Sequence, residues 1–212
     1  AARPHNLVFM GMGEPLDNAT AVIDALSILT DPAGYGFSPR RITVSTAGLA
    51  KRLPELVHVH PQVNLAWSLT ATDDETRRQL MPVGRGVSIQ RMIDTLVALP
   101  ESGSRKLTLE YALLAGVNDG LDHARRLAAI ARQLGAHVNA IPFNEWPGAP
   151  YRRPTREAVR RFAVEVEASG GSISLRESKG QDIGAACGQL AGAVQAAEAA
   201  DAPQTAESLK SE

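Results

Sequence analysis

Six short runs rich in Val, Ile, Leu, Phe or Thr recur along this chain, separated by longer stretches with helical spacing. This alternation limits the possible folds more than any other feature. The runs have the length and composition of β-strands and cover residues 6–10, 41–45, 63–69, 106–114, 137–143 and 172–176. Strands that alternate with helices are typical of parallel βαβ units, whose crossovers are right-handed. The sequence therefore predicts an α/β protein with an open doubly wound sheet or a barrel-like curved sheet.

Amphipathic stretches with recognisable ends lie between these strands. Asp17 is predicted to cap a helix that runs to about residue 29, and Ser88 one over 89–99. Thr155 is predicted to cap a helix that ends near Gly170. Two more helices are predicted over 121–134 and 183–199. No G-x-G-x-x-G turn follows the first strand, which disfavours a dinucleotide fold and favours a partial (β/α) barrel.

Composition narrows the domain organisation and the class of function. The chain has 212 residues, of which 44% are hydrophobic, and a net charge of −1. We expect one domain over residues 1–199 and a small, polar, disordered tail over 200–212. Because a global basic field is absent, any RNA contact is expected from local patches or from another domain. The single cysteine excludes an internal disulfide.

The sequence has neither a long apolar run nor the apolar core of a signal peptide, so we expect a cytoplasmic protein without a membrane segment. The chain begins without Met, which favours a fragment of a longer protein.

The loop after the first strand is the first candidate site, because chemistry in such folds lies at the carboxyl ends of the strands. It reads Gly11-Met12-Gly13-Glu14-Pro15. Glycines let a ligand approach the backbone, and Glu14 is placed to accept hydrogen bonds from a cationic amine. The alternative is a tight turn with a solvated glutamate.

Hydroxyl groups stand at the ends of the next two strands. Ser45 and Thr46 end the second strand, and Ser68, Leu69 and Thr70 end the third. Hydroxyls at neighbouring strand ends can bind a ribose or a carboxylate. The alternative is that they cap a helix or close a turn.

The loop after the fifth strand contains an amide and two aromatic rings. Asn144 has donors and acceptors that suit the edge of an adenine, and Trp146 and Tyr151 can stack on an unpaired base. The alternative is a proline-stiffened surface loop.

The remaining reactive side chains are less distinctive. Cys187 lies among alanines and is either an inert buried thiol or, with Lys179 or Arg176 close by, a nucleophile. His58 and His60 lack accompanying carboxylates, so a solvated loop is expected there and no metal site is predicted. Arginines cluster on predicted helix faces, as either solvated surface or a phosphate patch: Arg77, Arg78, Arg152, Arg153, Arg156, Arg160 and Arg161.

Taken together, these segments resemble one family, the bacterial radical S-adenosylmethionine (SAM) methyltransferases that methylate adenine C2 in 23S ribosomal RNA and some transfer RNAs. The resemblance covers nearly all of residues 5–192. Its motifs occur in the family's order: V-F-M-G-M-G-E-P-L at 8–16, R-R-I-T-V-S-T-A-G at 40–48, A-W-S-L-T-A-T-D-D-E-T-R-R-Q-L-M-P at 66–82, E-Y-A-L-L-A-G-V-N-D at 110–119, and the segments 139–151 and 176–192.

The resemblance implies a role for each candidate residue. Gly13 and Glu14 hold the methionine amine of SAM, Asn144 binds its adenosine end, and Cys187 becomes S-methylated. The carboxylate and ribose of SAM are contacted by Ser45, Ser68, Leu69 and Thr70. A second SAM is cleaved by a [4Fe-4S] cluster, and the resulting radical converts the S-methyl group into a carbon radical that adds to adenine C2.

The resemblance also implies partners and a fold. The partners are 23S rRNA, some tRNAs and an electron donor such as a flavodoxin, and the enzyme is expected to be monomeric. The fold is a partial barrel of the radical SAM type. The family's C-x-x-x-C-x-x-C cluster loop does not occur here, so we expect this chain to lack the first strand and cluster loop and to be inactive alone.

The sequence departs from the family's motifs at two places, and two functions other than adenine-C2 methylation stay open. Thr70 stands where many relatives have histidine, and the loop 81–86 differs from the common form. The rival enzyme is the sister group that methylates adenine C8 and confers antibiotic resistance. The rival of another class is a non-catalytic remnant that binds SAM or RNA.

Overall fold

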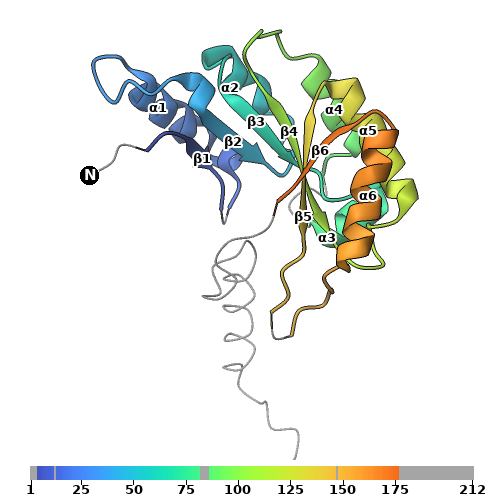
Figure 1. Ribbon diagram of the computed structural model, residues 1–212. Coiled ribbons are helices and arrows are strands. Elements are labelled where there is room, and N and C mark those ends of the chain that lie inside the picture. Colours follow the sequence, from blue (N-terminus) through green and yellow to red (C-terminus); the bar gives the residue numbers. More distant parts are fainter. Residues whose placement is uncertain (1–3, 12, 82–85, 147, 177–212) are drawn as a thin grey trace, which may run out of the picture.

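The strands form one parallel sheet. The computed structural model describes residues 4–11, 13–81, 86–146 and 148–176. Its six-stranded sheet has the order β1-β2-β3-β4-β5-β6, and every neighbouring pair is parallel (Figure 1). The strands are β1 Leu7–Phe9, β2 Ile42–Thr46, β3 Asn64–Ser68, β4 Leu107–Leu113, β5 His137–Pro142 and β6 Ser172–Leu175. The six predicted strands are confirmed, with small shifts at their ends, and so is the curved-sheet alternative.

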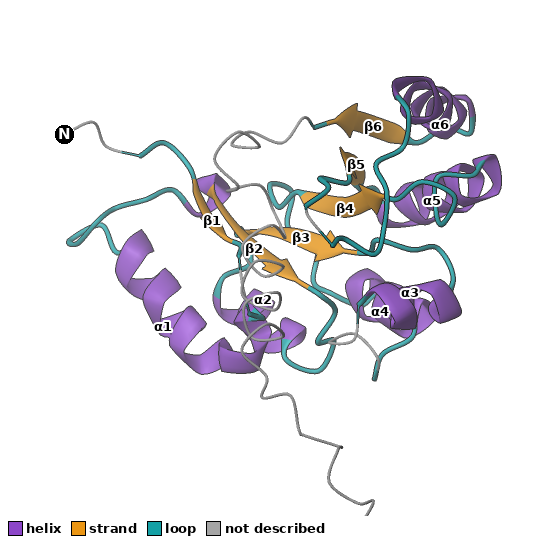
Figure 2. Ribbon diagram, turned by 90° about the horizontal axis from the view of Figure 1, so that it is seen from below, coloured by secondary structure: helices purple, strands orange, loops and turns teal. Residues whose placement is uncertain are grey.

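Helices α1 to α6 lie along one side of the curved sheet (Figure 2). The helical elements are η1 Pro15–Asn18, α1 Ala19–Thr30, η2 Pro39–Arg41, α2 Leu53–Val59, α3 Asp74–Leu80, α4 Ile89–Val97, α5 Leu121–Leu134 and α6 Arg156–Ala168. The helix predicted over 183–199 and the tail lie outside the described residues. Helices α2 and α3 were not predicted, because two turns are too short to display a clear apolar period.

The helix caps confirm two of the three predicted starts. Ser88 Oγ accepts a hydrogen bond from the Arg91 N–H at 3.1 Å, and Thr155 Oγ1 accepts one from the Ala158 N–H at 3.1 Å. The predicted cap at Asp17 is wrong. Proline at the first position starts the 3₁₀ turn η1, which contains Asp17, and α1 begins only at Ala19.

The core lies between the sheet and these helices. In β4 the side chains of Leu109, Tyr111 and Leu113 are fully buried, whereas the alternating Thr108 and Glu110 are only half-buried. The ring of Tyr111 stacks on that of Phe162 in α6, with centroids 5.6 Å apart. One face of each strand therefore packs on helices.

The opposite face of the sheet, called the inner face below, carries the alternate residues. Strand register aligns four polar side chains across this face, and we call them the polar row: Ser68, Glu110, Asn139 and Ser174. A second register row contains Ser45, Ala66, Thr108, His137 and Ser172. Among the described residues, no helix combines the length and the apolar character needed to cross a bilayer.

Candidate functional site

The loop after β1 is held in place by its own glutamate. Gly11 and Gly13 have φ values of 140° and 98°, which L side chains rarely adopt. Glu14 Oε1 accepts from the Leu16 N–H at 2.9 Å, and Oε2 accepts from the Ala47 N–H at 2.6 Å. The carboxylate therefore ties the end of β1 to the loop after β2. Glu14 caps the turn η1, so the tight turn of the alternative is confirmed, but its side chain is half-buried and not fully solvated. Each oxygen retains a lone pair for a ligand.

The serines and threonines at the strand ends separate into two roles. Thr46 is buried and its Oγ1 accepts from the Gly48 N–H at 2.9 Å, so this hydroxyl closes a turn, as the alternative interpretation predicted. Ser45 and Ser68 are half-buried and belong to the inner face. Thr43 shares this face two residues earlier, so Ser45 and Ser68 are the inner-face hydroxyls nearest the carboxyl ends of β2 and β3.

Thr70 adopts an unusual backbone conformation at the end of β3. Its φ is 58°, and it is the only non-glycine residue with positive φ in the described part of the chain. The Ala71 N–H donates to the Leu69 carbonyl at 2.7 Å, which makes a three-residue turn centred on Thr70. A β-branched residue in this region costs free energy and persists where its surroundings impose it.

Asn118 imposes that turn. Its Nδ2 donates to the carbonyls of Thr70 and Ala112, each at 2.7 Å, and its Oδ1 accepts from the Leu114 N–H at 2.7 Å. The side chain of Asn118 is fully buried, and the backbone carbonyl of the same residue accepts from the Tyr111 hydroxyl at 3.0 Å. Asn118 is not among the residues predicted from the sequence, although it occurs in the G-V-N-D segment after a predicted strand.

Asn144 lies in the loop after β5, as predicted, and is buried. Its Oδ1 accepts from Arg153 Nη1 at 3.0 Å. The rings of Trp146 and Tyr151 pack around Phe143, with centroids 5.1 and 6.2 Å away. The loop is thus stabilised by its own aromatic cluster, and base stacking by these two rings stays a prediction. Cys187 lies outside the described residues.

Arg77 corrects one interpretation of the arginine clusters. Its side chain is buried, and Nη2 donates to the carbonyl of Ala47. The guanidinium lies 5.9 Å from the ring centroid of Trp67. Burial lowers the pKa of Arg77, while Asp74 raises it. Arg77 therefore stabilises the loop after β2 through its bond to Ala47. Its side chain is neither solvated nor placed to bind phosphate.

His60 corrects a second interpretation. It is buried, and its Nε2 hydrogen-bonds with Ser27 Oγ at 3.2 Å and the Ile23 carbonyl at 3.1 Å. The predicted solvated loop is wrong at this position, because α2 brings His60 against α1.

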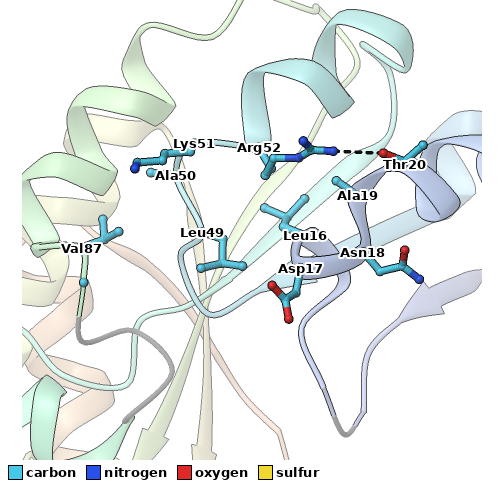
Figure 3. A pocket seen from close by; sticks show the side chains of 11 residues that line it. Leu16, Asp17, Asn18, Ala19, Thr20, Leu49, Ala50, Lys51, Arg52 and Val87 are labelled. Carbon is cyan, nitrogen blue, oxygen red and sulfur yellow. Dashed lines mark hydrogen bonds between the residues drawn. The ribbon is translucent and has the colours of Figure 1, made fainter.

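A pocket of about 530 Å³ lies beside the strand ends (Figure 3). Arg52 Nη2 in its wall donates to Thr20 Oγ1 at 3.1 Å. The lining consists of Leu16, Asp17, Asn18, Ala19, Thr20, Leu49, Ala50, Lys51, Arg52, Gly86 and Val87. None of the predicted site residues that the structure describes lines this pocket, so we assign the candidate site to the inner face and strand ends instead.

Curated relatives match most of this chain. It is 44% identical over 187 residues to the dual-specificity RNA methyltransferase RlmN of Geotalea uraniireducens, covering 88% of this chain and 54% of that protein. It is 46% identical over 191 residues to the protein of the same name from Geobacter sulfurreducens, covering 90% and 53%. The chain thus spans about half the length of the curated relatives it matches.

Solved structures agree with this match. A radical SAM methyltransferase from Sphaerobacter thermophilus superposes with a TM-score of 0.82 at 42% identity, over 89% of this chain and 55% of that one. A domain of pyruvate-formate lyase-activating enzyme from Bacteroides vulgatus superposes with a TM-score of 0.61 at 18% identity, over 82% of this chain and 99% of that one, and shows the fold alone. No protein-family model matches the chain. The chain belongs to the RlmN-type family of radical SAM RNA methyltransferases and has the family's partial barrel.

Proposed function

We propose that the protein containing this chain uses SAM to methylate adenine C2 in 23S rRNA and in tRNA. The similarity to proteins named dual-specificity RNA methyltransferase RlmN supports this proposal. In the same proposal the protein is a cytoplasmic monomer that receives electrons from a donor such as a flavodoxin.

One structural observation supports the proposal that this chain binds SAM. Glu14 bonds to the Ala47 N–H at 2.6 Å, which joins the loops after β1 and β2. This brings a carboxylate close to the strand ends that carry Ser45 and Ser68, so an amine acceptor and two hydroxyls share one edge of the sheet. These groups fit SAM, which supplies the methyl group.

Each predicted residue then has a role. Glu14 accepts from the ammonium of the methionine portion, and Gly13 leaves room for its approach, because nothing lies within 4 Å of a Cβ at that position. The carboxylate and ribose are bound by Ser45, Ser68, Leu69 and Thr70. Asn144 binds the adenosine end.

Cys187 is the methyl carrier in this proposal. Its thiolate attacks the methyl carbon of SAM, a carbon–sulfur bond forms, and S-adenosylhomocysteine leaves with the electrons of the broken bond. The thiol proton passes to solvent before attack, since the thiolate is the nucleophile.

The iron–sulfur cluster does not fit this chain alone. A [4Fe-4S] cluster in a radical SAM site needs several cysteine thiolates, and this sequence has one cysteine. We therefore assign no step to a cluster and locate its ligands in the half of the relatives that this chain does not match.

The test joins residues 1–212 to that remaining half of the Geobacter sulfurreducens relative. The joined protein is purified without oxygen and incubated with SAM, a reductant and transcripts of 23S rRNA or tRNA. Mass spectrometry of the digested RNA should detect 2-methyladenosine, and Cys187→Ala should abolish it. A product methylated at C8 would favour the resistance-type rival. SAM binding without RNA methylation would favour the non-catalytic remnant.

A further inference from the structure

Glu110 occupies an unexpected place for a carboxylate. It lies in the middle of β4, between the buried residues Leu109 and Tyr111, and its half-buried side chain belongs to the inner face. Its own carbonyl accepts from the N–H groups of Leu69 and Thr70 at 3.0 and 3.3 Å. The backbone of Glu110 is therefore bonded directly to the strand end where SAM is proposed to bind.

A chain of hydrogen bonds holds this carboxylate. Asn139 Nδ2 donates to Glu110 Oε1 at 3.0 Å, and Ser174 Oγ donates to Asn139 Oδ1 at 2.9 Å. Because the Ser174 hydroxyl donates its proton to Asn139, its oxygen is left to accept from His137 Nε2, 2.9 Å away. Every donor in this series of hydrogen bonds points toward Glu110.

The surroundings of Glu110 make its ionised carboxylate cost free energy of folding. Burial raises its pKa, while the bond from Asn139 and the positive charges of Arg176 and His137 lower it. A neutral side chain would pack on this face without desolvating a charge. A carboxylate that is buried at a cost and held by oriented donors is typical of a binding site.

We propose that Glu110 binds the vicinal hydroxyls of the ribose of SAM. The strand order supports this position. Glu14 follows β1 and is assigned to the methionine amine, and Asn144 follows β5 and is assigned to the adenosine end. Glu110 lies on β4, between them, as the ribose lies between methionine and adenine.

The chemistry of Glu110 favours the same ligand group. A carboxylate repels phosphate and the carboxylate of methionine, but it accepts two hydroxyl donors at once, as acidic residues do for ribose in dinucleotide sites. Its neighbour in the polar row is Ser68, which adds a further hydroxyl partner.

The inference rests on the proposed SAM site, and the experiment separates the two. Calorimetry measures binding of S-adenosylhomocysteine, adenosine and 2′,3′-dideoxyadenosine to the 212-residue chain. We compare the unchanged chain with Glu110→Gln and with a matched control, Glu75→Gln, whose side chain is exposed on α3. Circular dichroism verifies that all three are folded.

We expect Glu110→Gln to weaken binding of S-adenosylhomocysteine and adenosine about 10-fold or more. The same variant should leave the affinity for 2′,3′-dideoxyadenosine unchanged, since that ligand has no hydroxyls to lose contact with. Glu75→Gln should change none of the three affinities.

Two results would overturn the inference while leaving the SAM site intact. One is an unchanged affinity for adenosine in Glu110→Gln. The other is an equal loss for adenosine and its dideoxy analogue, which indicates a general disturbance of the sheet. If the unchanged chain binds none of the three ligands, the proposed SAM site itself fails.

Discussion

Asn118 Nδ2 donates to the carbonyl of Thr70 at 2.7 Å, across 48 residues of sequence. This bond joins the loop after β4 to the strained turn after β3. The same amide group bonds to Ala112 and Leu114, so one buried side chain fixes the geometry of two neighbouring strand ends.

Replacing Asn118 by alanine should therefore destabilise the protein. The change leaves the half-buried carbonyls of Thr70 and Ala112 and the buried N–H of Leu114 without this partner, and we expect a loss of about 2–4 kcal/mol in the free energy of unfolding. Urea denaturation measures it. Asn18→Ala is the matched control, because Asn18 is exposed and caps α1 without a side-chain hydrogen bond. Equal losses for both variants would contradict the role of Asn118.

The loop after β2 depends on the backbone conformation of Gly48. Its φ is 115°, and an added Cβ would lie 3.2 Å from Arg77 Nη2 and 3.5 Å from Trp67 Nε1. Gly48→Ala should cost roughly 1–3 kcal/mol from backbone strain alone. Gly103→Ala, where nothing lies within 4 Å of the new methyl group, should stay within about 0.5 kcal/mol of the unchanged chain in thermal unfolding. A tolerated alanine at position 48 would show that the loop rearranges easily.

Glu14 and Glu145 provide a matched pair for SAM binding. Both carboxylates accept backbone hydrogen bonds, Glu14 from Leu16 and Ala47 and Glu145 from the Arg153 N–H at 2.7 Å. Only Glu14 is proposed to meet the ammonium group, and a charge-assisted bond contributes about 1.5–3 kcal/mol. Glu14→Gln should thus weaken SAM binding at least about 10-fold in calorimetry.

Glu145→Gln is the control for this prediction, because it makes the same chemical change in the loop after β5. It should leave SAM affinity within about 2-fold of that of the unchanged chain. Equal losses for the two variants would mean that Glu14 acts only as a turn residue.

The pH dependence of the free energy of unfolding should show how much the ionised carboxylate of Glu110 destabilises the fold. Burial raises its pKa above the ordinary value of 4.5. A carboxyl group with a raised pKa stabilises the folded state at pH values below the unfolded pKa, and this contribution is lost as pH rises through the folded pKa. Near pH 7 the ionised group is therefore a net cost, and Glu110→Gln should raise the free energy of unfolding there.

The difference in the free energy of unfolding between Glu110→Gln and the unchanged chain should shrink as the pH falls to about 4, where the Glu110 carboxyl becomes protonated. Urea denaturation at both pH values measures it. A variant that is less stable than the unchanged chain near neutral pH would show that the charge of Glu110 supports the fold. Higher stability together with weaker adenosine binding would identify a residue kept for function.

Local patterns in the sequence were enough to predict the strands and to place several candidate residues at strand ends. The six apolar runs each produced one parallel strand, and Ser88 and Thr155 cap helices as predicted, because a strand or a cap depends on residues only a few positions apart. Glu14 and Ser45 were placed at strand ends by the same reasoning, since parallel strands bring their carboxyl ends to one edge.

The tertiary structure alone decided which polar side chains are buried and which partners hold them. Arg77 bonds to the loop 30 residues before it, His60 to a helix 33 residues before its position, and Asn118 to a turn 48 residues away. Glu110 becomes a held carboxylate only when β4, β5 and β6 align Asn139 and Ser174 beside it. These partners are distant in sequence, and a buried polar group is stable only after packing has brought its partner within hydrogen-bond distance.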